Sequence, residues 1–312
     1  MSAIGFLKQK GKQVVIKITN HFCRIQLPDP LLVNIDKLIR TGYRILLKRK
    51  PDEQGLRHYK RMLGSAEMSP QAFFEDLMAS DEFREKFYFR NHLFSLHYSR
   101  CQFIRMLPKA SRILDLGGSS QHDDRGALVC MGYPYKFEEL IIVDLPVDES
   151  HPIYRSKKDL DVVQSELGAI CYSYHSMTDL SSYPDASFDM VVSGQSIEHV
   201  TEEEGDQMIR ETFRVLKPGG YFCLDTPNGP ACRLHLPGFI SDDHKIEYSH
   251  EQLSAKIKRA GFEICDALGL NYMGESFRNN VFSLEEVAKN IGVFADIEHC
   301  YLLAYICQKP AE

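Results

Sequence analysis

The 312-residue chain lacks several features that mark common classes of protein. Its apolar runs all fall short of the ~18 residues that a membrane-spanning helix requires. Its nine cysteines are scattered, with no CxxC pair and no Cys/His cluster at zinc spacing. Lysines interrupt the apolar residues of the first 22 positions, which makes a poor signal peptide. Internal repeats and low-complexity segments are absent as well. We therefore expect a cytoplasmic protein with reduced cysteines.

Charge is unevenly distributed along a composition that is ordinary for a folded protein, with 44% hydrophobic and 26% charged residues. Residues 1–62 hold fourteen Lys/Arg against four Asp/Glu, a net charge of +10. Because the whole chain has a net charge of −6, residues 63–312 carry −16. A basic N-terminal region indicates an anionic partner, such as a membrane surface, a polyanion or another protein. A solvated helical face explains it equally well. The acidic remainder argues against broad nucleic-acid binding.

Two textures divide the chain. Residues 1–30 have weak periodicity and predict a tail or loose helix, whereas 31–90 show apolar residues at helical spacings of three and four. Ser69-Pro70 is typical of a helix start. From about residue 111, apolar strand-like runs alternate with helical segments, three of which open on capping boxes at Thr201–Glu204, Ser249–Gln252 and Ser283–Glu286. This alternation predicts a mostly parallel sheet covered on both faces.

The stretch "RILDLGGSS" at 112–120 indicates a strand that leads into a ligand-binding loop. Glycines there let the backbone approach a ligand closely. The loop lacks the GxGxxG of dinucleotide sites, which counts against an NAD-dependent oxidoreductase. Instead, Asp115 lies in the end of the first strand and Asp144 ends the second, within "IIVDLP". Two acids there suit a cationic amino acid carried on a nucleoside, as in S-adenosylmethionine.

Four segments together resemble the ordered motifs of class I S-adenosylmethionine-dependent methyltransferases: "RILDLGGSS", "IIVDLP", "SMTDLSSYPDASFDMVVSGQSIEHV" and "RVLKPGGYFCLDTPN". The resemblance covers roughly residues 91–312. It implies an α/β fold with a seven-stranded Rossmann-like sheet whose last strand is reversed. The segments "VDLPVDESHPIYR" and "DDHKIEYSHEQL" further resemble a bacterial subgroup associated with cell-surface polysaccharide synthesis.

The resemblance implies a set of residues that hold S-adenosyl-L-methionine. Asp115 would lie near the methionine moiety, Asp144 would bind the ribose hydroxyls, and Leu145 would pack on the adenine. Asp179 would accept a hydrogen bond from the adenine amino group, although it could equally cap a turn. Ser119 departs from the glycine common in the family; it fits if its backbone φ stays negative. The expected cofactor residues are Asp115, Gly117, Gly118, Ser119, Asp144, Leu145, Asp179, Leu180, Ser193, Gly194 and Gln195.

The acceptor side is predicted from polar residues after the fourth and fifth strands. A hydroxyl acceptor needs a base near neutrality, and histidine is the usual one. We expect His244 to serve as that base or as an acceptor contact, with His199 as the other candidate; His199 could instead only position the adjoining helix. Asn228, Glu247 and Tyr248 are the expected substrate contacts, while Tyr248 could alternatively anchor the next helix.

A metal is not expected. Asp242-Asp243-His244 suggests a divalent cation, which some sugar methyltransferases use, but the sequence has no second acidic group at a supporting spacing.

The segments "KRKPDEQGLRHYKRML" and "ASDEF", within residues 31–90, resemble a helical module of unknown function found beside bacterial carbohydrate-modifying transferases. The resemblance implies docking or substrate presentation, or mere stabilisation of the larger domain. We expect a basic tail at 1–30, this module at 31–90 and a methyltransferase domain at 91–312. We expect no nucleic-acid partner for the protein.

The favoured hypothesis is O-methylation of a sugar or polysaccharide intermediate by a protein on the inner face of the membrane or free in the cytoplasm. A small-metabolite or lipid-linked acceptor and a non-catalytic S-adenosylmethionine-binding scaffold are the alternatives.

Overall fold

The computed structural model describes residues 14–16, 25–27, 34–80, 82–83, 92–120, 123–146 and 160–311, and the chain divides into two compact units, 1–90 and 91–312. Within the described ranges, every helix is too short or too polar to span a bilayer. The functions expected of these units remain predictions.

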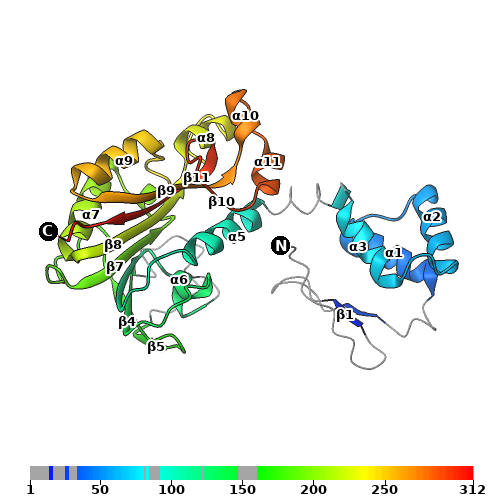
Figure 1. The fold of residues 1–312 in the computed structure, drawn as a ribbon, viewed down its shortest axis with the longest axis horizontal. Coiled ribbons are helices and arrows are strands. Elements are labelled where there is room, and N and C mark those ends of the chain that lie inside the picture. The colour runs from blue at the N-terminus through cyan, green and yellow to red at the C-terminus, as the bar shows by residue number, and fades with distance from the viewer. Residues whose placement is uncertain are drawn as a thin grey trace. The chain divides into compact units, whose positions relative to one another are not determined.

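The first unit is built around three helices, α1 (Ile35–Leu46), α2 (Glu53–Gly64) and α3 (Pro70–Ala79) (Figure 1). Ser69 accepts a hydrogen bond from Ala72 N and Pro70 opens α3, which confirms the predicted helix start. The helices enclose a small core of their own that includes Ile39, Tyr43 and Phe73.

Two short strands, β1 (Val14–Ile16) and β2 (Ile25–Leu27), pair antiparallel in the region expected to be a tail or loose helix. The helical alternative is wrong for these six residues, whose partners lie across a strand pair rather than one turn away. The rest of 1–30 lies outside the described residues.

The second unit is organised around one mixed sheet. Its nine strands lie in the order β10-β9-β11-β8-β7-β3-β4-β6-β5. The central strands β3 (Arg112–Leu116), β4 (Glu139–Asp144), β6 (Ala169–Tyr174), β7 (Phe188–Gly194) and β8 (Leu216–Pro227) are parallel. The last strand, β11 (Cys300–Gln308), runs antiparallel between β8 and β9 (Glu263–Tyr272). The reversed last strand is as expected.

The expected count of seven strands is wrong for the described sheet. Two short strands extend its edges, β5 (Val162–Gln164) beside β6 and β10 (Val293–Phe294) beside β9, each antiparallel to its neighbour. They have only three and two residues, too few for a repeating apolar pattern that the sequence could display.

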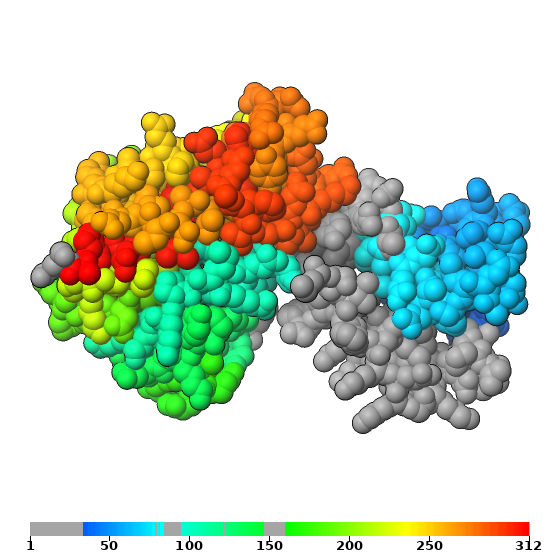
Figure 2. All heavy atoms as spheres, viewed as in Figure 1, coloured from blue at the N-terminus to red at the C-terminus, as the bar shows by residue number. Residues whose placement is uncertain are grey.

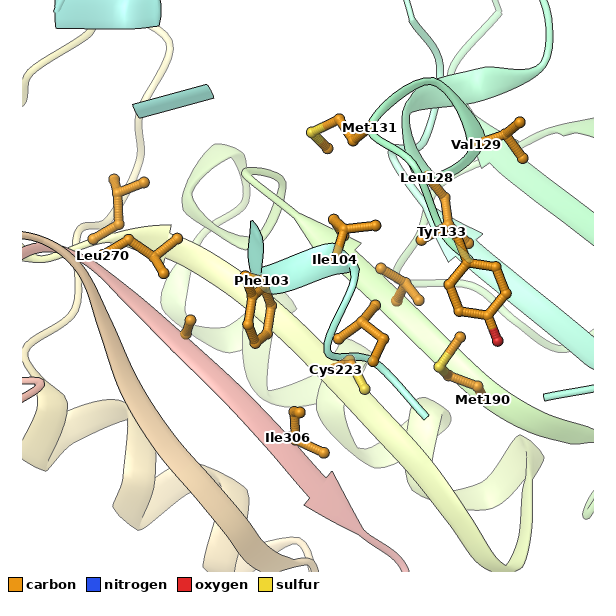
Figure 3. Close-up of a cluster of buried hydrophobic side chains, with 14 of the residues drawn as sticks. Phe103, Ile104, Leu128, Val129, Met131, Tyr133, Met190, Cys223, Leu270 and Ile306 are labelled. Atoms are coloured by element: carbon orange, nitrogen blue, oxygen red, sulfur yellow. The ribbon is translucent and has the colours of Figure 1, made fainter. Parts of the chain in front are cut away.

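Alternating side chains of the central strands enter two different cores, because successive residues of a strand point to opposite faces. Ile113 and Ile142 pack in one core, and Leu114 and Val143 pack in the other. Figure 3 shows the first core, where Phe103 and Ile104 of α5 (His92–Ile104) meet side chains of the sheet. The sheet is thus buried on both faces.

Helices cover both faces of this sheet. Helices α7 (Glu202–Val215) and α9 (His250–Arg259) begin at the predicted capping boxes of Thr201 and Ser249, and both boxes are present. At the third predicted box, Ser283 accepts from Glu286 N, but the Glu286 side chain accepts from Ser276 instead of completing the box. Helix α5 contacts the distant α11 (Leu284–Lys289), which is visible as teal beside orange in Figure 2. Three short helices complete the unit: α6 (Gly126–Cys130), α8 (Gly229–His235) and α10 (Gly274–Arg278). The carboxyl ends of the parallel strands share one edge, where ligands collect in open α/β sheets.

Candidate active site at the carboxyl edge of the sheet

The loop after β3 folds back against its own strand-end acid. Asp115 is only 3% exposed, and a Cβ built on Gly118 would lie 2.1 Å from its Oδ2. Gly117 has φ +75°, and its Cβ would lie 2.4 Å from Ser196 Oγ. Both glycines are therefore required by close approach, as well as by backbone conformation at Gly117. Ser119 is not among the positive-φ residues of the described chain, so the condition for a serine there is met.

The end of β4 lies beside this loop, because Leu116 pairs with Val143 across the two parallel strands. Asp144 is half-buried and accepts a hydrogen bond from Leu145 N (2.8 Å) through Oδ1. Leu145 is 41% exposed, a large apolar side chain at the surface next to Asp144. This arrangement offers a carboxylate and an apolar contact side by side.

Asp179 and Leu180, which were predicted to lie at the cofactor, differ in burial. Asp179 is exposed and its Oδ1 accepts a hydrogen bond from Ser181 N (3.1 Å), which is the turn-capping alternative. Hydrogen bonds from the Ser181 side chain and backbone lower the pKa of the Asp179 carboxyl. Its adenine contact remains a prediction. Leu180 is fully buried in the second core of the sheet. Its side chain packs in this core, and the expected cofactor contact of Leu180 remains a prediction.

A buried ion pair lies at the ends of β7 and β8. Arg100 Nε of helix α5 donates to Asp225 Oδ1 (2.6 Å), and Gln195 Nε2 donates to the same oxygen (2.8 Å). Gln195 holds φ +56°, an uncommon conformation fixed in part by the hydrogen bond from its N–H to Asp225 O. A Cβ on Gly194 would lie 2.7 Å from Arg100. Ser193 is fully buried, and its Oγ has no hydrogen-bond partner within the described chain.

These acids form an electrostatic group. Burial, together with the like charges of Asp144 and Asp225, raises the pKa of Asp115 to about 7, and Arg100 opposes this shift. Because Arg100 already pairs with the carboxylate of Asp225, this cation is not available to neutralise a ligand. The loop end of the group therefore favours a cationic ligand over an anionic one.

On the far side of β7, Glu198 lies in the one-turn helix η3 (Ile197–His199) and is 1% exposed. Its Oε2 accepts a hydrogen bond from Thr226 Oγ1 (2.9 Å). Burial raises the pKa of Glu198 to about 7. Its carbonyl oxygen accepts from the N–H groups of Lys245 and Ile246, which ties the loop after α8 to η3.

This tie brings the two predicted histidines together. The rings of His199 and His244 lie edge to face with centroids 5.0 Å apart. His199 is exposed, whereas His244 is 9% exposed. His244 Nδ1 lies 2.7 Å from Glu247 Oε1. A carboxylate only accepts hydrogen bonds, so Nδ1 carries the proton and Nε2 of neutral His244 has a lone pair.

The three residues predicted to contact the substrate have protein partners or are buried in this structure, and their contact with a substrate remains a prediction. Glu247 is buried and accepts from His244, Ile240 N and Arg233, so it orients His244. The amide nitrogen of Asn228 donates to the carbonyls of Glu298 and Cys300, which uses both of its N–H groups. Tyr248 is fully buried in the second core, which favours its anchoring alternative.

Three residues of the site were missed from the sequence. Asp225 ends a strand as Asp115 does, and the same pattern could have identified it. Glu198 precedes His199 in the quoted "SIEHV" but has no distinguishing spacing. Arg100 lies 125 residues from its partner on an ordinary helix, and no local signal marks it.

A family model described as "Methyltransferase domain" matches residues 147–224. A protein of Mycolicibacterium smegmatis named "probable S-adenosylmethionine-dependent methyltransferase" is 39% identical over 87 residues, which cover 28% of this chain and 33% of that protein. The chain thus spans about a third of the length of this curated relative.

Two solved structures are similar to the chain. A SAM-dependent methyltransferase of Thermotoga maritima has a TM-score of 0.48 and 17% identity, covering 72% of this chain and 93% of its own. A SAM-dependent methyltransferase of Methanosarcina mazei has a TM-score of 0.45 and 20% identity, covering 67% and 97%. The family match and the curated relative show that part of this chain, which includes residues 147–224, is similar to a methyltransferase domain.

Proposed function

We propose that the chain methylates a hydroxyl oxygen of a sugar or polysaccharide intermediate, using S-adenosyl-L-methionine. The observation that carries the proposal is that two acids and two imidazoles lie at the same edge of the sheet. The strand-end acids Asp115 and Asp144 flank the loop after β3, and an imidazole pair, His199 and His244, follows β7 and β8. The acids suit a cationic nucleoside, and the imidazoles suit an acceptor whose proton must leave.

The residues of the loop fit this cofactor. Gly117 and Gly118 carry no side chain where Ser196 Oγ and Asp115 Oδ2 already lie, so the loop packs closely on the acid that would face the cofactor. When bound, S-adenosylmethionine supplies a methyl group on a sulfonium. The thioether that remains is a good leaving group, so transfer depends mainly on positioning the acceptor. Asp144 would accept hydrogen bonds from the ribose hydroxyls, Asp115 would face the charged amino-acid end, and Leu145 would pack against the adenine.

On the acceptor side, a histidine would remove the proton of the acceptor hydroxyl. Glu247 holds His244 in one orientation, with Nε2 on the side away from the Nδ1 hydrogen bond. His199 contributes an exposed imidazole next to it. A sugar acceptor is supported by the resemblance of "DDHKIEYSHEQL" to polysaccharide-linked enzymes, because this segment contains His244 and Glu247. A small-metabolite or lipid-linked acceptor uses the same chemistry.

Isothermal titration with S-adenosylhomocysteine against NAD tests the cofactor. We expect binding of the former only; a chain that ignores S-adenosylhomocysteine would refute the proposal. Methyl transfer from labelled S-adenosylmethionine to a panel of nucleotide sugars and glycans tests the acceptor. Binding of the cofactor without transfer to any member of the panel would favour the scaffold alternative.

We further propose an anionic partner for the first unit, for a protein that works at the inner face of a membrane. Its helix α1 and the following turn line a hollow of about 830 Å³ whose cations are Lys37, Arg40, Arg44, Lys48, Arg49 and Lys50. Basic residues near an anionic surface contribute ~1 kcal/mol each. Sedimentation with vesicles containing anionic lipid should exceed that with neutral vesicles and fall with salt; equal sedimentation would contradict the proposal.

A further inference from the structure

The geometry points to a divalent-cation site formed by Glu198, His199 and His244. Each residue offers one ligand atom, and the three atoms lie within 4.8 Å of one another. Within the described ranges, this is the only group of three His, Cys, Asp or Glu residues so placed. Ligand atoms bound to one cation at ~2.1 Å lie somewhat closer together, so small side-chain rotations complete the site. The expectation of no metal overlooked Glu198, which the fold brings to His244.

His244 is already arranged as a metal ligand. Its Nδ1–H donates to Glu247 (2.7 Å), which leaves Nε2 as the coordinating atom. Glu247 is itself held by Ile240 N (2.7 Å) and by Arg233, so the imidazole is oriented before any cation arrives. Metal-bound histidines in proteins commonly donate their second nitrogen to a carboxylate in this way.

Glu198 supplies the negative charge. It is 1% exposed, and its carboxyl accepts hydrogen bonds from Thr226 Oγ1 (2.9 Å, to Oε2) and from its own backbone N–H. A buried carboxylate requires compensation by a cation or by further hydrogen bonds, and a metal ion on Oε1 would provide it. The carbonyl of Glu198 binds Lys245 N (2.8 Å), so the same short segment also fixes the loop that contains His244.

The ligand chemistry limits the metal. Two imidazole nitrogens and one carboxylate favour a first-row transition-type cation, such as Mn²⁺, Fe²⁺, Co²⁺ or Zn²⁺, over Mg²⁺ or Ca²⁺, which prefer oxygen. Three protein ligands leave further coordination positions open, and His199 is exposed, so these positions reach the surface. Neighbouring hydroxyls of a sugar would fit them as a pair of oxygen ligands.

The cation would change the role of the imidazoles. His244 with Nε2 bound to a metal is no longer a base, so we infer that it acts on the acceptor through the cation. This part rests on the proposed function. A metal-bound hydroxyl loses its proton more readily, and that proton passes to water. The oxygen then forms the new O–C bond while the C–S bond breaks, its electron pair remaining on sulfur.

Metal binding is measured on the full chain after treatment with EDTA, with CoCl₂ alone as the probe. Visible absorption and calorimetry should give one tightly bound Co²⁺ per chain. His199→Ala, which removes an exposed ligand and leaves the core intact, should weaken binding at least ~10-fold. Glu247→Gln, which touches no ligand atom, should weaken it ~10- to 100-fold. His299→Ala is the matched control, because His299 also pairs with a carboxylate, Asp296 (2.7 Å); its Co²⁺ affinity should equal that of the wild type.

Two results would overturn the site: no stoichiometric Co²⁺ in the wild type, or equal affinity in wild type and His199→Ala. Titration with S-adenosylhomocysteine on the same samples separates this inference from the proposed function. If the chain binds S-adenosylhomocysteine but does not bind Co²⁺, only the proposed metal site is refuted. Co²⁺ binding without cofactor binding removes the methyltransferase proposal and leaves the site.

Discussion

The two halves of the candidate site share one edge of the sheet but are built in different ways. The cofactor half consists of strand ends: Asp115 and Asp144 follow adjacent parallel strands, and their positions follow from the strands themselves. The acceptor half brings Glu198 and His199 against His244, which is 45 residues away from His199 and lies in a loop. Hydrogen bonds from that loop to the Glu198 carbonyl hold the half together.

This difference teaches where each half is vulnerable. Strand-end acids are supported by the sheet, so their loss should affect ligand binding more than folding. The acceptor half depends on contacts between segments, so a change there should affect turnover without affecting the cofactor. Asp225 raises the pKa of both Asp115 and Glu198, which shows that the two halves are electrostatically connected.

The largest expected effect is on turnover. His244→Ala should lower the rate of methyl transfer ~100-fold or more, because both the proposed base and the proposed metal site depend on this imidazole. The Kd for S-adenosylhomocysteine should remain within ~2-fold of the wild type. His58→Ala, an exposed histidine of the first unit, serves as the control. Unchanged turnover in His244→Ala would show that the acceptor half is assigned wrongly.

The next effect is on cofactor affinity. Asp144→Ala should weaken S-adenosylhomocysteine binding roughly 100-fold, because two hydrogen bonds to a charged acceptor are lost, at ~1.5 kcal/mol or more each. Calorimetry measures the change, with Asp266→Ala, an exposed acid of β9, as the control. If the two variants bind equally well, Asp144 does not hold the ribose.

A smaller effect is expected from pH. The pKa of Asp115 is raised to about 7, so this carboxyl is neutral below that pH and charged above it. A cation binds the charged form better, and S-adenosylmethionine keeps its sulfonium charge at any pH. Its affinity should therefore rise ~10-fold from pH 6 to pH 8, one pKa unit being 1.36 kcal/mol. Asp115→Asn should bind more weakly and without this dependence, whereas a flat wild-type profile would contradict it.

The smallest effect is predicted at Asp179. Its exposed carboxylate caps a turn through Ser181 N, so Asp179→Ala should cost ~1 kcal/mol of stability or less. Cofactor affinity should change less than ~3-fold. A 10-fold loss in calorimetry, with the melting temperature unchanged, would restore the adenine contact and extend the cofactor half to this loop.

Particular residues show how far the sequence alone could predict the site. Asp115 and Asp144 were identified because each interrupts an apolar run at a strand end, a pattern visible locally. Leu180, Asn228 and Tyr248 were placed at the ligand because they lie near such ends, but their side chains turn into the protein. A position after a strand limits where the backbone lies and leaves the direction of the side chain undecided.

The fold follows the same division. The alternation of strand-like apolar runs with helical segments predicted that both faces of the sheet would be buried, and the capping boxes predicted where α7 and α9 begin. These features depend on neighbours a few residues away. Only the tertiary structure decided that Arg100 neutralises Asp225 and that Glu198 meets His244. Those contacts join segments far apart in the chain, and packing between them, which no local periodicity encodes, determines their geometry.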